Sequence, residues 1–218
     1  MNPPGDEATR GIPTALTRVS VVDDDLSMRE SLHSLLRAVG HDVHLFESVQ
    51  QFLAAPDGLR ADCLILDVRL PGQSGLELQR ELLRAGADLP IVFITGHGDV
   101  PMSVAAMKAG AIEFLTKPFR DADLLEAVRR GTELTRRRRD EAGVMAELRR
   151  RFDSLSARER EVMALVCSGR MNKQIAADLE LSEITVKVHR GKVMRKMRAE
   201  SLPELVRFAD RLASAAKA

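Results

Sequence analysis

Acidic side chains follow two short apolar runs of this sequence. The first run ends in three consecutive carboxylates, and the second ends in Asp67, shortly before the turn signal Pro71-Gly72. Two later apolar runs end in a hydroxyl and an ammonium group, those of Thr95 and Lys117. Crowded carboxylates repel one another and bind protons more tightly unless a cation lies between them. Magnesium suits such a place, because it prefers oxygen ligands and is held by one or two carboxylates together with a phosphate.

With such an ion bound, Asp67 is ionised and can attack a phosphorus atom. Phosphoryl transfer needs the equatorial oxygens to be neutralised, and the Lys117 ammonium and the Thr95 hydroxyl can contribute to this. We therefore interpret Asp67 as a phosphorylation site. Each residue alone is common: Asp25 is expected to cap a helix, and a lysine before proline is usually a surface residue. Their joint appearance at the ends of successive apolar runs favours the site.

These side chains must be positioned by strands of one sheet. Short apolar runs bounded by turn residues are typical of buried parallel strands, and ligands collect at the carboxyl ends of such strands. Apolar runs alternate with helical stripes five times, which predicts an α/β fold with a doubly wound, flavodoxin-like, five-stranded parallel sheet. We expect strands at 19–22, 42–46, 63–67, 91–95 and 112–116. We expect helices at 27–39, 49–55, 75–84, 101–109 and from 122 onward.

Four motifs carry a resemblance to a known family. They are Val21-Val22-Asp23-Asp24-Asp25, Leu66-Asp67-Val68-Arg69-Leu70-Pro71-Gly72, Ile94-Thr95-Gly96-His97-Gly98 and Phe114-Leu115-Thr116-Lys117-Pro118-Phe119. Residues 15–131 thus resemble the receiver domain of bacterial two-component response regulators. The resemblance implies that Asp67 takes a phosphoryl group from a phosphohistidine of a sensor histidine kinase. It also implies a cis peptide between Lys117 and Pro118.

The same resemblance implies a magnesium (or manganese) site and a switch. Asp24, Asp67 and the backbone carbonyl of Arg69 would bind the ion directly, and Asp23 would bind it through water. Thr95 would move toward the phosphoryl group, and the aromatic ring of Phe114 would swing inward behind it. Many relatives have tyrosine in place of Phe114, so here the switch must be read by packing and not by a hydroxyl.

Two residues flank the predicted site where the family tunes the lifetime of the phosphate. Arg69 and His97 stand two positions after Asp67 and Thr95. A metal-binding role for His97 is the alternative. A phosphohydrolase with an aspartate nucleophile would usually have a second carboxylate at the position of Arg69, which argues against an enzyme. We therefore expect a phosphoacceptor with no other catalytic activity.

Charge is distributed unevenly along the chain. Residues 14–131 hold 12 basic against 17 acidic side chains, whereas residues 153–218 hold 13 against 9. A basic C-terminal part suggests a polyanion as its partner. The sequence has no Trp or Tyr, which makes aromatic stacking on nucleic-acid bases an unlikely mode.

The C-terminal part contains a helix-turn-helix candidate. Ser156 with Glu159 fits a capping box at the start of a helix, and a short helix from Asn172 is followed by one over 183–197 that Ser182 can cap. At about 100° per residue, one face of the 183–197 helix is apolar and the other is cationic. We expect DNA contacts from Lys187, Val188, Arg190, Gly191, Lys192 and Arg195.

That cationic face suits a major groove. Lysine and arginine bind phosphates or guanine edges, Val188 can touch a thymine methyl, and Gly191 lets the backbone approach. The alternative is a solvated basic helix within an ordinary bundle, and the helix-turn-helix spacing favours the groove. The segments 155–159, 172–176 and 185–190 strongly resemble the LuxR-type DNA-binding domain. Over nearly its whole length the chain resembles response regulators of the FixJ/NarL type, some of which have a basic residue at the position of Gly191.

Four segments are therefore expected. They are a disordered tail (1–14), the receiver domain (15–131), a linker that continues the fifth receiver helix (132–152), bent near Gly131 or Gly143, and a LuxR-type domain (153–218). The four arginines at 136–139 are either a solvated helical face or a contact for phosphate or kinase. The resemblance implies a homodimer formed on phosphorylation through the fourth helix, fifth strand and fifth helix, a face that contains Met107, Lys108 and Glu113. Promoter DNA is expected as the target, with RNA polymerase as a further partner.

Composition limits the remaining possibilities. No apolar run reaches the roughly 18 residues that a membrane helix needs, and no secretory signal is evident, so we expect a cytoplasmic protein without membrane contact. Cys63 and Cys167 lie in apolar runs and are expected to be buried thiols, which suits a reducing compartment. A signalling adaptor whose C-terminal bundle binds protein or RNA is the other alternative.

Overall fold

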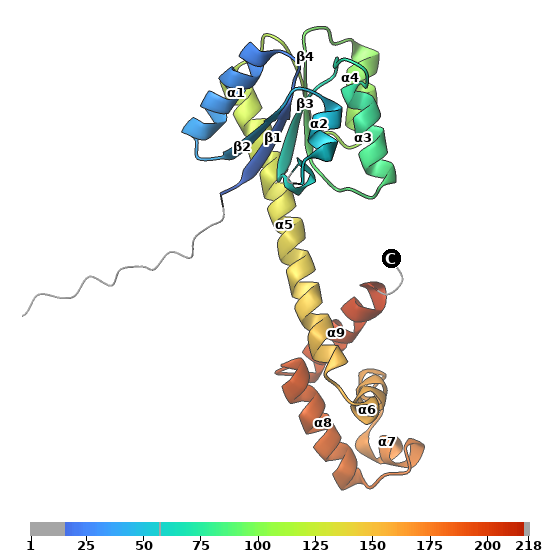
Figure 1. Ribbon diagram of the computed structural model, residues 1–218. Coiled ribbons are helices and arrows are strands. Elements are labelled where there is room, and N and C mark those ends of the chain that lie inside the picture. Colours follow the sequence, from blue (N-terminus) through green and yellow to red (C-terminus); the bar gives the residue numbers. More distant parts are fainter. Residues whose placement is uncertain (1–15, 57, 216–218) are drawn as a thin grey trace, which may run out of the picture. The chain divides into compact units, whose positions relative to one another are not determined.

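The computed structural model describes residues 16–56 and 58–215, which form two compact units (Figure 1). The N-terminal unit extends to Arg137, and the C-terminal unit begins at Arg138. The tail expected at residues 1–14 lies outside the described residues. No helix among the described residues is both long and apolar enough to cross a membrane.

The N-terminal unit is an α/β fold. Its parallel strands are β1 (Arg18–Val22), β2 (Asp42–Phe46), β3 (Cys63–Asp67), β4 (Ile91–Thr95) and β5 (Glu113–Thr116), in the spatial order β2-β1-β3-β4-β5. Between them lie α1 (Leu26–Ala38), α2 (Val49–Ala54), the short 3₁₀-helix η1 (Gly58–Arg60), α3 (Gly75–Arg84) and α4 (Val100–Lys108). The predicted fold class is confirmed, with β5 one residue shorter than expected because Ile112 precedes its ladder.

Helices cover both faces of this sheet, because its central strands are apolar on both sides. β3 and β4 are buried along their whole length. Cys63, Ile65 and Val92 pack with residues of α1 and α5 on one face. Leu64 and Phe93 pack with residues of α2, α3 and α4 on the other face. The sheet is therefore a rigid platform whose strand ends hold the loops that follow them.

Helix α5 (Asp121–Asp153) is one uninterrupted helix that belongs to both units. We expected a bend near Gly131 or Gly143; at Gly131 the structure shows that this glycine permits close packing. A Cβ atom added there would lie 2.8 Å from Cys63 Sγ, so any larger residue would separate α5 from β3. One turn later, the Thr135 hydroxyl donates a hydrogen bond of 2.7 Å to the carbonyl of Asp62. These contacts tie α5 to the start of β3.

The C-terminal unit contains the end of α5 and four further helices. These are α6 (Ala157–Cys167), α7 (Asn172–Asp178), α8 (Glu183–Met197) and α9 (Leu202–Ala215). Ser156 and Glu159 form the expected capping box of α6, and Ser182 accepts a hydrogen bond from Thr185 N at the start of α8. One apolar cluster joins these helices, and its fully buried members include Val162, Ile175, Val186, Met197 and Leu205.

Candidate functional site

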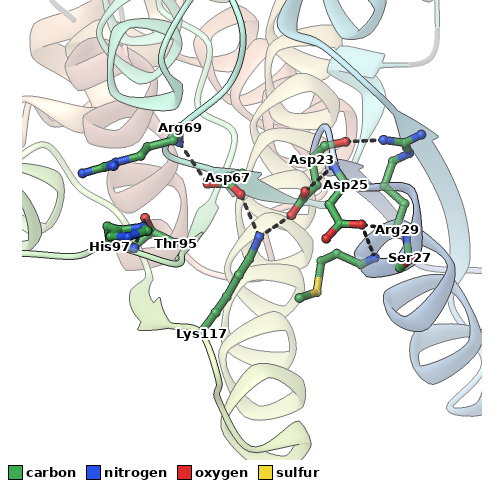
Figure 2. Close-up of polar contacts among 10 residues, drawn as sticks. Asp23, Asp25, Ser27, Arg29, Asp67, Arg69, Thr95, His97 and Lys117 are labelled. Carbon is green, nitrogen blue, oxygen red and sulfur yellow. Dashed lines mark hydrogen bonds and ion pairs between the residues drawn. The ribbon is translucent and has the colours of Figure 1, made fainter.

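An acid pocket lies at the carboxyl edge of the sheet. Asp23 follows β1, Asp67 ends β3, and Lys117 follows β5, so three elements far apart in the sequence meet there (Figure 2). Lys117 Nζ lies 2.7 Å from Asp23 Oδ2 and 2.7 Å from Asp67 Oδ2. The structure thus brings together the carboxylates and the ammonium group that the sequence pattern pointed to, with the lysine joining both acids.

The loops hold these carboxylates by their second oxygens. Asp23 Oδ1 accepts a hydrogen bond of 2.9 Å from Asp25 N, and Asp67 Oδ1 accepts one of 2.9 Å from Arg69 N (Figure 2). Asp25 caps α1 as expected, through Ser27 N and Met28 N. Each acid therefore points one oxygen at its own loop and the other at Lys117.

Arg29 is a pocket residue that the sequence reading missed. From the first turn of α1, its guanidinium donates a hydrogen bond of 2.6 Å to the backbone carbonyl of Asp23 (Figure 2). Its position four residues after an N-cap aspartate places it beside the loop, but only the side-chain conformation shows that it binds a backbone oxygen. This contact helps to fix the loop that carries Asp23 and Asp24.

Burial sets the electrostatics of the pocket. Asp23 is fully buried, and burial raises the pKa of its carboxyl group by more than the hydrogen bonds from Lys117 and the Asp25 amide lower it. The nearby Asp67 carboxylate raises the same pKa further. For Lys117, burial alone lowers the pKa, but the hydrogen bonds with Asp23 and Asp67 outweigh it and leave the pKa raised. The two carboxylates thus share one ammonium group, whose single positive charge cannot balance both of them.

The donor set fits a divalent cation. Carboxylate oxygens of Asp23, Asp24 and Asp67 all lie within 4.8 Å of one another. Asp24 is exposed, whereas Asp23 and Asp67 are buried, so the site opens to solvent on one side. Magnesium takes hard oxygen ligands and keeps several of its waters, and a half-open cluster of carboxylates meets both needs.

Thr95 and Phe114 lie on the neighbouring strands β4 and β5. The Thr95 side chain is buried, and its hydroxyl accepts a hydrogen bond of 3.3 Å from His97 N. The Phe114 ring packs at a tilt against Phe93, with 6.1 Å between centroids. A Cβ atom at Gly98 would lie 2.9 Å from the Phe114 ring and 3.1 Å from Thr95 Cγ2. Gly98 therefore leaves room for both side chains, a role that only the three-dimensional contacts show.

Helix α8 carries the second candidate site. Lys187, Val188, Gly191, Lys192 and Arg195 are all exposed. Arg190 is half-buried, and its guanidinium donates a hydrogen bond of 2.6 Å to Asn172 Oδ1, which ties α8 to the start of α7. Five of the six predicted residues thus face solvent, and the sixth is engaged within the domain. The sequence reading left out Ile184, which is also exposed on this helix.

Two family models match the chain. Residues 19–129 match the response regulator receiver domain, and residues 153–209 match the LuxR family of bacterial regulatory proteins. The chain is 54% identical to Nodulation protein W of Bradyrhizobium diazoefficiens over 89% of this chain and 86% of that protein. It is 44% identical to the transcriptional regulatory protein FixJ of Rhizobium meliloti, over 88% of this chain and 94% of that protein.

Solved structures agree with these matches. The response regulator StyR superposes with a TM-score of 0.80 at 47% identity, covering 89% of this chain and 98% of StyR. Full-length FixJ from B. japonicum superposes with a TM-score of 0.55 at 42% identity, covering 91% of this chain and 98% of FixJ.

Proposed function

This chain belongs to the response regulators that join a receiver domain to a LuxR-type DNA-binding domain, and we propose that phosphorylation of Asp67 controls its binding to DNA. As a member of this family it is a transcription regulator with a two-component mode of control. The single observation that carries the proposal is the acid pocket, where Lys117 joins Asp23 and Asp67 at 2.7 Å each.

Asp67 is the proposed phosphoacceptor. A carboxylate oxygen of Asp67 attacks the phosphorus of a phosphohistidine on a sensor histidine kinase, the P–N bond breaks, and the histidine nitrogen keeps the electron pair. Lys117 already contacts Asp67, and its ammonium group would move from the Asp67 oxygen to a phosphoryl oxygen. The Thr95 hydroxyl, which donates to no oxygen in the contacts described above, would turn toward the same group.

Asp24, Asp67 and the Arg69 carbonyl are proposed to bind magnesium or manganese directly, with Asp23 bound through water. When bound, the ion supplies positive charge that neutralises the phosphoryl oxygens. The chain's own residues do the rest: Arg29 and the Asp25 amide hold the Asp23 loop, and the Arg69 amide orients Asp67.

The response is proposed to pass through packing to the face formed by α4, β5 and α5. As Thr95 turns, the Phe114 ring, which already lies against Gly98, moves inward behind it. Val104 and Met107 of α4 are exposed apolar residues on this face, and Arg130 forms a salt bridge of 2.7 Å with Glu113. A homodimer formed there would bring two α8 helices to two half-sites of promoter DNA and increase affinity by linkage. We propose RNA polymerase as a further partner. We also propose that the protein acts in the cytoplasm.

We also propose that the protein turns over no substrate besides its own phosphoryl group. Arg69 lies where an aspartate-dependent hydrolase would place its acid/base carboxylate, and a guanidinium group does not serve as a general acid or base. A generic phosphate ester should therefore not be hydrolysed.

Labelling with a phosphodonor tests the central step. The full chain is incubated with radiolabelled acetyl phosphate and Mg²⁺, and Asp67→Asn should lose the label completely because the amide is not a nucleophile. Asp140→Asn, which changes an exposed aspartate of α5, is the matched control and should keep the label. A labelled Asp67→Asn protein would refute the proposal.

A further inference from the structure

Ile184 is an apolar side chain that the fold leaves in solvent. It lies in the first turn of α8 and exposes 78% of its surface. Val188, four residues later, exposes 52%. A single exposed apolar residue needs no explanation, but these two are neighbours on one helix, where side chains four positions apart stand over one another.

The two residues lie at the centre of the cationic face. With 3.6 residues per turn, Ile184, Val188, Gly191 and Arg195 fall within roughly 60° of one another around the axis. Lys187 and Lys192 flank this stripe on either side. The opposite side of the helix is fully buried and carries Val186, Val193 and Met197.

Folding does not account for an isoleucine at this position. The start of α8 is stabilised by its neighbours, since Ser182 Oγ accepts a hydrogen bond of 3.1 Å from Thr185 N and lies 2.8 Å from the Thr185 hydroxyl. The packing of α8 rests on its buried side. A β-branched residue lowers helix propensity, and this one gains little from burial in return.

Among the described residues, none fills the space at Gly191 in this stripe. A Cβ atom added at Gly191 would meet no atom within 4 Å, so the surface next to Val188 is open. An exposed apolar stripe between two lysines matches a surface that is anionic at its edges and has apolar groups inside. The major groove of DNA has this character, because phosphates line it and the C5-methyl of thymine is the apolar group on its base edges.

We propose that Ile184, together with Val188, contacts thymine methyl groups in the major groove, so that Ile184 is a residue that determines sequence specificity. This inference rests on the proposed DNA-binding function of α8. The two side chains are about 6 Å apart along the helix axis, which corresponds to about two base-pair steps of DNA. The preferred site should therefore contain two thymines spaced by about that distance in each half-site.

Replacing thymine by uracil tests this directly, because it removes one methyl group and keeps every hydrogen-bonding atom. The probe is the duplex that the full-length protein selects from a random library in the presence of acetyl phosphate and Mg²⁺. Each thymine of that duplex is then replaced singly by deoxyuridine. We expect one replacement to weaken binding by the wild-type protein about fourfold through loss of an Ile184 contact, and a second to do so through Val188.

Variants assign the contacts. Ile184→Ala should bind the thymine duplex about fourfold more weakly and should no longer distinguish thymine from uracil at its own position, while still doing so at the Val188 position. Val188→Ala should show the reverse. Val39→Ala removes a side chain of equal exposure from the N-terminal unit and should leave both discriminations unchanged.

The outcomes separate the inference from the function beneath it. If Ile184→Ala and the wild type distinguish thymine from uracil equally at every position, the contact by Ile184 is refuted while DNA binding stands. If the wild type selects no duplex with or without phosphodonor, the DNA-binding function itself is refuted. Because Ile184 is exposed, circular dichroism should show an unchanged fold for the variant.

Discussion

Each unit of the protein contains a buried carboxylate bound to a lysine, and the two pairs behave in opposite ways. In the N-terminal unit, Lys117 Nζ lies 2.7 Å from Asp23, and the pKa of Asp23 is raised, chiefly by burial. In the C-terminal unit, Lys196 Nζ lies 2.7 Å from Glu159, and the pKa of Glu159 is lowered, chiefly by that hydrogen bond. The distance between lysine and carboxylate therefore does not explain why the pKa shifts of Asp23 and Glu159 have opposite directions.

The surroundings of the two carboxylates explain the difference. Glu159 also accepts a hydrogen bond from the Ser156 amide in its capping box. Lys196 and this amide therefore both stabilise the charged form of Glu159. Asp23 shares its lysine with a second carboxylate, Asp67, which adds repulsion to burial. The pair at Glu159 is a structural brace between α6 and α8. The pair at Asp23 is part of an incompletely neutralised cluster that gains from a further cation.

Removing the lysine of each pair should sharpen this comparison most. Lys117→Met leaves two buried carboxylates facing each other, and we expect its free energy of unfolding without divalent metal to fall by about 3 kcal/mol. Added Mg²⁺ should restore more stability to this variant than to the wild type, as measured by urea unfolding with chelator and with Mg²⁺. Lys196→Met is the matched control, and an equal recovery by Mg²⁺ there would contradict the distinction.

Neutralising Glu159 should lower the free energy of unfolding by less than the loss of Lys117, and this effect should depend on pH in a defined direction. Because the pKa of Glu159 is lowered in the folded protein, its stabilising effect is present above the unfolded value of about 4.5 and is lost as the pH falls through the folded value. Glu159→Gln should lower the free energy of unfolding by about 1–2 kcal/mol at pH 7, and the difference from the wild type should shrink toward low pH. Urea unfolding across this pH range measures it, with the neighbouring Glu161→Gln as control. A difference that grows toward low pH would contradict the assignment.

Neutralising Asp23 should have the smallest effect and the opposite sign. Its raised pKa means that the folded protein favours the protonated form, so ionisation of Asp23 reduces stability as the pH rises from 3.8 through the folded value. In chelator, Asp23→Asn should therefore be more stable than the wild type at pH 7, and the gain should vanish at low pH. A less stable variant at pH 7 would show that Asp23 acts as a brace in the same way as Glu159.

The position of the pocket could be predicted from the sequence, because parallel strands end at one edge of a sheet and each run ends in a polar residue. The distribution of contacts could not. Spacing does not show that one lysine joins both Asp23 and Asp67, or that Arg29 binds a backbone carbonyl. The roles of Asp67, Asp24, Thr95 and Lys117 in phosphoryl transfer stay predictions.

Helix α5 and helix α8 show where the reading from sequence falls short. A glycine inside a helix is compatible with a bend or with close packing, and only the distance from Gly131 to Cys63 decides for packing. On α8, a choice of DNA contacts by positive charge leaves out Ile184, although its angular position places it on the cationic face. The charge of Arg190 predicts a DNA contact. Its hydrogen bond to Asn172 could not be predicted, because it depends on how α7 and α8 meet.

The contact between Gly131 and Cys63 has a practical consequence for chemical labelling. Burial raises the pKa of the Cys63 thiol to about 12, and α5 lies over its sulfur, so a thiol reagent can reach Cys63 only after α5 separates from β3. Cys167 is only half-buried and would react first, so it has to be replaced by serine. In such a protein the rate at which the reagent alkylates Cys63 measures how often α5 separates from β3. No cysteine has to be introduced for this measurement.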